Sequence, residues 1–209
     1  MRASKSLVYQ CWAARYLPLM HALLTAAIRA WAPRLTDAEL AAGWACFHPL
    51  TPRRHEVLLR PDELAERMYF VEQGCLRIFF IQDNGQEATR YLAFEGQFAT
   101  ALVSFITGTP SLEYLQALED TQLHYISRAD IYHLLDTVPA WESFYRRYLE
   151  GAYVTNTTRL HSFLTLDART RYQQLLAQSP AVVQRLPNKL VASYLHLSQE
   201  TLSRLKSKR

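Results

Sequence analysis

The spacing of hydrophobic residues changes twice along the chain. From Met20 to about Ala45 apolar residues recur roughly every three to four positions, which predicts two short helices, the second opened by a capping pair of Thr36 and Glu39. Between residues 56 and 127 the spacing shortens to runs rich in Val, Ile, Phe and Tyr that turn residues separate. The runs are Glu56–Arg60, Met68–Gln73, Cys75–Gln82, Glu87–Ala93, Glu113–Glu119 and Gln122–Ser127. They predict a compact antiparallel barrel, with Asp83-Asn84-Gly85 as a tight hairpin turn of positive φ.

Helical spacing returns after the barrel. Ser127 and Asp130 predict a capped helix, and Pro139 suits the first turn of a longer one. The apolar stripe of that second helix continues for about six turns, which is more apolar surface than one barrel would cover. We interpret residues 139–165 as a dimerisation helix, and a helix packed only on its own barrel is the alternative. The residues expected in the dimer seam are Trp141, Phe144, Tyr148, Ala152 and Phe163.

Residues 188–209 predict two short helices that cross through a tight turn. Ala192 falls where the two helices approach most closely and only a small side chain fits. His196 falls in the turn, where a non-glycine residue in the left-handed conformation costs on the order of 1 kcal/mol. Ser198 suits the N-cap of the second helix. The small core between the helices is expected to consist of Leu195, Leu197, Leu202 and Leu205.

Positive charge is concentrated in the same segment. From Pro187 to Arg209 five basic residues stand against one acid, Glu200, so this segment carries the whole net charge of +4. A basic C-terminal segment on an otherwise neutral chain indicates a partner that carries phosphate groups. On the second helix, Arg, Gln and Glu side chains suit the edges of DNA bases, and lysines suit the backbone phosphates. The expected DNA-binding residues are Ser198, Gln199, Glu200, Ser203, Arg204, Lys206 and Lys208.

Several classes of protein and site are disfavoured. Cys11, Cys46 and Cys75 have no paired spacing, and the seven histidines show no close pair, so we expect no disulfide framework, no metal site and no cofactor. No nucleophile and base pair is visible, which argues against an enzyme. The apolar segment Leu17–Ile28 is shorter than the roughly 20 residues that span a membrane, and no signal cleavage site follows it. We expect a cytoplasmic protein with no membrane partner.

Five motifs together resemble the Crp/Fnr superfamily, in particular its short members from Bacteroidetes-type bacteria. They are MYFVEQG (68–74), DNGQEATRYLAFEGQF (83–98), ALED (117–120), ISRADI (126–131) and ASYLHLSQETLSRLKSK (192–208). The resemblance covers about residues 20–209. It implies an α+β fold with an antiparallel β-roll or jelly-roll barrel, similar to cyclic-nucleotide-binding domains and flanked by helices. A long dimerisation helix and a C-terminal helix-turn-helix would follow, and each half of a homodimer would lay its recognition helix in the major groove of double-stranded DNA.

The resemblance divides the chain into four parts. Residues 20–138 form the sensor domain, residues 139–165 the dimerisation helix and residues 166–209 the DNA-binding domain. We interpret residues 1–19 as an N-terminal extension that is not native, with Met20 as the natural start.

The expected ligand pocket departs from relatives that bind cyclic AMP. Those relatives carry a Gly-Glu-Leu set and an Arg-Ser pair, where this chain has Thr100-Ala101-Leu102 and Ser111-Leu112. Without a cation for the phosphate or a carboxylate for the ribose, we predict no binding of cyclic nucleotides. An unknown apolar or weakly polar ligand and no ligand at all both remain open. The candidate pocket residues are Phe98, Thr100, Ala101, Ser111, Leu112 and Tyr114.

These observations favour a homodimeric transcription regulator that binds double-stranded DNA. Two alternatives come from other classes of protein. One is a ligand-binding barrel module whose terminal helices serve only oligomerisation, and the other is a cupin-like enzyme built on the same kind of barrel. Specific duplex binding that weakens steeply with salt distinguishes the regulator from the ligand-binding module.

Overall fold

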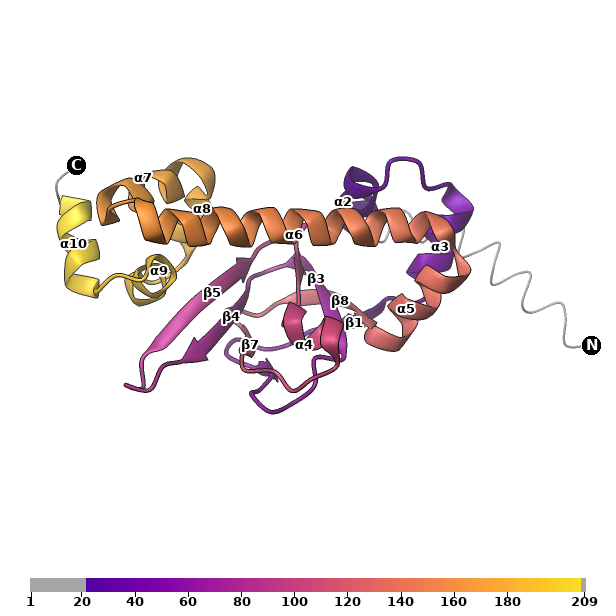
Figure 1. The fold of residues 1–209 in the computed structure, drawn as a ribbon, viewed down its shortest axis with the longest axis horizontal. Coiled ribbons are helices and arrows are strands. Elements are labelled where there is room, and N and C mark those ends of the chain that lie inside the picture. The colour runs from indigo at the N-terminus through magenta and orange to yellow at the C-terminus, as the bar shows by residue number, and fades with distance from the viewer. Residues whose placement is uncertain (1–21, 208–209) are drawn as a thin grey trace, which may run out of the picture.

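The structure is a computed structural model that describes residues 22–207. A β-roll lies beneath one long helix, α6, and a group of short helices follows at the end of α6 (Figure 1). The predicted extension of residues 1–19 and the predicted phosphate contact of Lys208 lie outside the described residues.

The β-roll consists of two antiparallel sheets of four strands each. The first sheet has the order β1 (His48–Leu50), β8 (Gln122–Ser127), β3 (Arg67–Gln73) and β6 (Phe98–Ala99). The second has the order β2 (Val57–Leu59), β7 (Tyr114–Ala117), β4 (Leu76–Ile81) and β5 (Glu87–Ala93). All six predicted strands are confirmed. β1, β6 and the short helix α4 (Leu102–Thr107) were not predicted, because β1 contains Pro49, β6 has two residues and α4 has fewer than two helical turns.

The turn between β4 and β5 is wider than the sequence suggested. Gly85 has a φ of 78°, but Asn84 is not among the described residues with positive φ. The backbone N–H of Gln82 donates to the carbonyl of Gln86 at 2.9 Å, and the Asn84 side chain accepts from the N–H of Gln86. The hairpin is confirmed, whereas the prediction of positive φ holds only for its glycine.

The helices next to the roll are α2 (Ala22–Trp31), α3 (Asp37–Trp44), α5 (Arg128–Thr137) and α6 (Pro139–Thr165). The last three begin where the sequence predicts, and the predicted start of the first, at Met20, lies outside the described residues. Thr36 and Glu39 form a complete capping box at α3, and the Ser127 side chain accepts from the backbone N–H of Asp130 at 3.0 Å. These local bonds satisfy N–H groups that the first helical turn leaves without a partner.

The first part of α6 belongs to the core of the roll. Trp141 and Phe144 are fully buried there, and the Trp141 indole donates to the carbonyl of Glu39 at 2.9 Å. Neither side chain keeps surface for a second chain, so their prediction as dimer-seam residues is wrong. Helical spacing marks an apolar stripe without telling which surface covers it.

The other predicted seam residues also contact their own chain. The half-buried Tyr148 ring lies 5.8 Å from that of Phe98, and Ala152 lines a cavity between α6 and the roll. Phe163 lies 4.6 Å from the ring of His196, near the C-terminal end of the chain. The apolar side chains that α6 exposes are Tyr153, Val154, Leu160 and Leu164.

The C-terminal helices share an apolar cluster with the outer face of the roll. They are α7 (Ala168–Gln178), α8 (Pro180–Arg185), α9 (Asn188–Leu195) and α10 (Gln199–Ser207). Their buried residues, including Tyr172, Val191 and Leu202, pack in one cluster with Cys75 and Leu92 of the roll. The helix group is therefore docked on the roll of its own chain (Figure 1). No helix of the described part is long and apolar enough to cross a membrane.

Candidate nucleic-acid interface

Helices α9 and α10 form the crossed pair that the sequence predicts, called the helix pair below. Ala192 is buried at their close approach, and Leu195 and Leu202 are buried between them. His196 has φ 52° and ψ 50°, so it adopts the left-handed turn conformation, and the N–H of Leu197 donates to the carbonyl of Ala192 at 2.9 Å. The turn therefore forms without glycine.

The exposed face of α10 carries the predicted base-reading residues. Gln199, Glu200, Ser203 and Arg204 are all exposed, whereas Leu202 on the opposite face is fully buried. The Ser198 hydroxyl accepts from the N–H of Thr201 at 3.2 Å and so caps the helix. Helical spacing alone produces this division, because residues three and four positions apart share a face.

Glu200 is the acidic residue of this exposed face. A hydrogen bond from its own backbone N–H holds the pKa of the Glu200 carboxyl below its ordinary value, and the Ser198 hydroxyl and Arg204 add to the effect. Glu200 is thus an acceptor at neutral pH. Lys206 is half-buried, and its Nζ donates to Asn188 Oδ1 at 2.5 Å, so this predicted phosphate contact is already engaged within the helix pair.

Strand β5 holds the first helix of the pair. The Ser193 hydroxyl on α9 accepts from the N–H of Thr89 at 3.0 Å and donates to the carbonyl of Glu87 at 2.7 Å. Behind this contact the buried Arg77 side chain donates through Nε to Thr89 Oγ1 at 2.8 Å and pairs with Glu87 at 2.7 Å. The orientation of the helix pair is therefore fixed by polar contacts to a strand of the roll.

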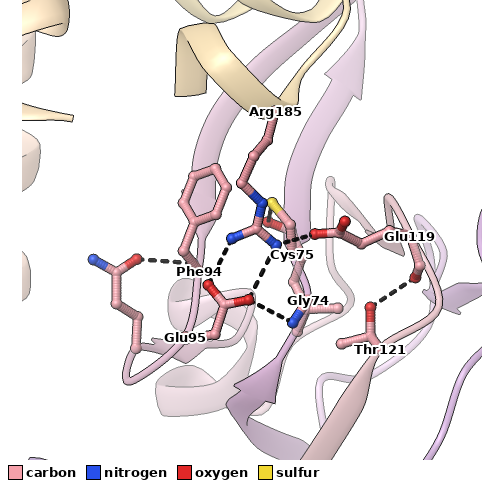
Figure 2. A network of polar contacts seen from close by, with 9 residues as sticks. Gly74, Cys75, Phe94, Glu95, Glu119, Thr121 and Arg185 are labelled. Carbon is pink, nitrogen blue, oxygen red and sulfur yellow. Dashed lines mark hydrogen bonds and ion pairs between the residues drawn. The ribbon is translucent and has the colours of Figure 1, made fainter. Parts of the chain in front are cut away.

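Arg185 at the end of α8 makes a second docking contact (Figure 2). Its guanidinium binds the Glu95 carboxylate through two nitrogens, at 2.7 and 3.0 Å, and also pairs with Glu119. Glu95 additionally accepts from the N–H of Gly74 at 2.8 Å. The hydrogen bond from Arg185 lowers the pKa of Glu95 to about 2. The sequence analysis missed these residues, because 66 and 90 positions separate the partners and no local pattern marks such pairs.

The predicted ligand-pocket residues do not gather at one site. Phe98 and Thr100 line a cavity of about 240 Å³ between the roll and α6, whereas Thr100 and Ala101 line another of about 230 Å³. Leu112 is 82% exposed, so its prediction as a pocket residue is wrong.

The remaining two candidate pocket residues line neither cavity. The Ser111 hydroxyl donates to the carbonyl of Glu113, and the Tyr114 ring stacks on Phe79 at 4.9 Å. Both side chains therefore have structural contacts within the chain, and neither belongs to the core cluster of the roll.

A cation that the sequence did not predict, Arg90, lines the cavity of about 240 Å³ between the roll and α6, which is called the larger roll cavity below. Arg90 on β5 lines this cavity beside Tyr148 of α6. Its guanidinium binds the Glu113 carboxylate through Nε and through Nη2, the latter at 3.0 Å. The positive charge is thus balanced within the chain, so an anionic ligand would have to compete with Glu113.

Comparison with known proteins identifies the fold. Residues 51–138 match the model of the cyclic nucleotide-binding domain family. The global regulator CLP of Xanthomonas campestris, described as responsive to c-di-GMP, has a similar solved structure, with a TM-score of 0.66 at 19% identity over 83% of this chain and 91% of CLP. The Thermus thermophilus catabolite activator protein gives a TM-score of 0.55 at 22% identity, over 84% of each chain. This chain has the Crp/Fnr-type fold.

Other Crp/Fnr-type structures give the same result. A protein assigned to the Crp/Fnr family from Eubacterium rectale has a TM-score of 0.65 at 14% identity, over 83% of this chain and 82% of that protein. No curated protein is significantly similar in sequence. At these identities the similarity establishes the fold, which confirms the resemblance to Crp/Fnr proteins and the predicted α+β architecture.

Proposed function

We propose that this Crp/Fnr-type protein is a transcription regulator that binds DNA as a homodimer. The observation that carries the proposal is the exposed face of α10, where Gln199, Glu200, Ser203 and Arg204 lie above a buried Leu202. Their side chains include the donors and acceptors that match base edges in the major groove. Ser198 caps α10, and the buried Leu195 and Leu202 pack the two helices together, which holds this face in place.

Dimerisation is proposed through the exposed stripe of α6. Tyr153, Leu160 and Leu164 are 71%, 59% and 77% exposed, and their spacing places them along one face of the helix. An apolar stripe of this kind on a long helix suits a second copy of the same helix. Two copies related by a two-fold axis would present two α10 helices to successive turns of a duplex.

Selection of bound duplexes from a random pool tests DNA binding and dimerisation together. We expect enrichment of a palindromic sequence whose half-sites are about 10 base pairs apart or a multiple of that distance. Affinity for the selected duplex should fall steeply as salt rises, because counterions are released on binding. A pool that shows no enrichment would contradict the proposal.

We further predict that the roll does not bind cyclic AMP. The carboxylate of Glu113 already neutralises Arg90, the cation that lines the larger roll cavity. Isothermal titration with cyclic AMP at up to about 1 mM should therefore show no binding heat. A saturable isotherm in this range would show that the ligand displaces Glu113.

A further inference from the structure

A cleft lies where the end of α6 meets the C-terminal helices. It has a volume of about 450 Å³, and α6, α7 and α9 line it. This volume falls within the range of sites for small organic ligands. The cleft shares only Thr155 with the larger roll cavity, and it does not include the exposed face of α10.

Arg159 of α6 forms one wall of this cleft. Its Nη2 donates to the carbonyl of Thr89 at 3.2 Å and to that of Tyr194 at 2.5 Å. The guanidinium carbon lies 3.7 Å from the centre of the Tyr194 ring and 5.0 Å from that of Phe163. Both hydrogen bonds to backbone carbonyls leave from Nη2, so Nε–H and Nη1–H have no backbone partner among the described residues.

Arg171 of α7 contributes a second guanidinium to the same cleft. Its carbon lies 5.5 Å from the centre of the Phe163 ring, the ring that Arg159 also contacts. Nη1 donates to the carbonyl of Leu166 at 2.7 Å, whereas Nε is buried without a hydrogen-bond partner in the described part of the chain. Two positive groups thus converge on one aromatic ring.

No carboxylate in the lining of the cleft balances these two charges, although the exposed Asp167 carboxylate interacts electrostatically with Arg171 from outside the cleft. Neither arginine makes an ion pair in the described part, and the lining of the cleft contains no aspartate or glutamate. Burial lowers the pKa of the Arg159 guanidinium, because the charged form is less favourable away from water. Both side chains are half-buried. Charges that are withdrawn from water in proteins are normally paired, so two guanidiniums without an ion-pair partner in one cleft suit an anion.

We propose that this cleft binds a small organic anion, with a carboxylate or phosphate group held by Arg159 and Arg171. Guanidinium groups bind both anions through paired hydrogen bonds. Leu175 and Leu195 supply apolar surface next to the charges, and Gln174 supplies an amide, so the ligand carries an apolar or aromatic part. The site is additional to the DNA-binding function and does not depend on it.

A ligand in this cleft would lie next to the contacts that dock the helix pair on the roll. Arg159 joins β5, through Thr89, to the end of α9, through Tyr194. An anion that draws the guanidinium toward the cleft changes the contact that docks α9 on the roll. Ligand affinity and the docking of the helix pair are then linked in both directions.

Isothermal titration of the full chain with phenyl phosphate and with benzoate tests the proposal. We expect saturable binding of at least one probe, and the tighter of the two identifies the preferred anionic group. Benzyl alcohol, which has a similar ring and no charge, should bind at least about tenfold more weakly. No binding of either anion, or equal binding of benzyl alcohol, would overturn the proposal.

Matched variants locate the binding. Arg171→Gln should lower the affinity for the probe about tenfold or more, because it removes a charge-assisted hydrogen bond to the anion. Arg169→Gln is the control, since Arg169 is exposed on the same helix and does not line the cleft. Thr158→Trp fills the cleft and keeps both arginines, so it should abolish binding even if Arg171→Gln impairs folding. Equal affinities of the two arginine variants, or unchanged binding by Thr158→Trp, would refute the site.

Discussion

Gly43 of α3 lies directly against α6, where there is no room for a side chain. A Cβ atom there would lie 1.9 Å from Cζ2 of Trp141, which is fully buried and hydrogen-bonded to Glu39. The glycine is needed for space, since its φ does not lie in the left-handed region. The absence of a side chain at Gly43 therefore allows α3 and α6 to pack at this short distance.

We expect Gly43→Ala to destabilise the protein by about 1–3 kcal/mol, the usual cost of overpacking a core. Chemical denaturation measures the change. Combining it with Trp141→Phe should recover part of the loss, because the smaller ring leaves room for the new methyl group. A Gly43→Ala variant as stable as the unaltered chain would show that the indole moves freely.

Arg204 on the exposed face of α10 is the residue at which base readout is tested most directly. Arg204→Ala should lower affinity for the selected duplex by about 1–3 kcal/mol and relax preference at one base pair. Lys206→Ala, by contrast, should weaken binding to all duplex sequences alike, because Lys206 is hydrogen-bonded to Asn188 within the helix pair and is not placed to read a base. Titrations against the selected duplex and against single-base variants of it distinguish the two effects. Unchanged affinity of Arg204→Ala for the selected duplex would refute its assignment.

Among the elements, α6 has the most varied surroundings. Its first part is buried in the roll core, its middle lines the larger roll cavity, and its last turns contact the helix pair. The face left exposed carries Tyr153, Leu160 and Leu164. One helix thus joins the roll, the proposed partner chain and the helix pair.

Leu160→Glu should convert the proposed dimer to a monomer, because it places a charge in the apolar seam. Sedimentation velocity measures the change. His161→Glu is the matched control, since His161 is exposed at the next position and lies off the stripe. A dimer that persists in Leu160→Glu would place the interface elsewhere.

In the molecule as a whole, docking of the helix group on the roll depends on ion pairs as well as on the shared apolar cluster. The pKa of Glu95 is lowered from 4.5 to about 2 by its hydrogen bond with Arg185. A carboxyl whose pKa is lower in the folded state stabilises the fold above its ordinary pKa, and this stabilisation is lost as the pH falls toward the lowered value. The side chain is partly exposed, so solvent screening reduces the size of the effect.

We expect Glu95→Gln to lower the thermal midpoint at neutral pH, and its difference from the unaltered chain to shrink between pH 4.5 and about 2. Thermal unfolding followed by circular dichroism measures both. Glu66→Gln is the control, because Glu66 is exposed and its side chain makes no ion pair in the described part of the chain. A difference that stays constant with pH would mean that the ion pair contributes nothing to docking.

The sequence alone determined what depends on neighbouring residues. The apolar runs of β3 to β5, the caps at Thr36, Ser127 and Ser198, and the turn at His196 are local features, because each depends on residues within a few positions. The exposed face of α10 follows from helical spacing in the same way.

Only the tertiary structure decided which surfaces meet. The stripe that begins at Trp141 was assigned to a partner chain, yet it packs on the chain's own roll. The contact between Thr89 and Ser193 joins residues 104 positions apart, and the cleft of Arg159 and Arg171 exists only where three helices converge. Burial depends on the surface that covers a side chain, and chain topology rather than local spacing brings that surface into place.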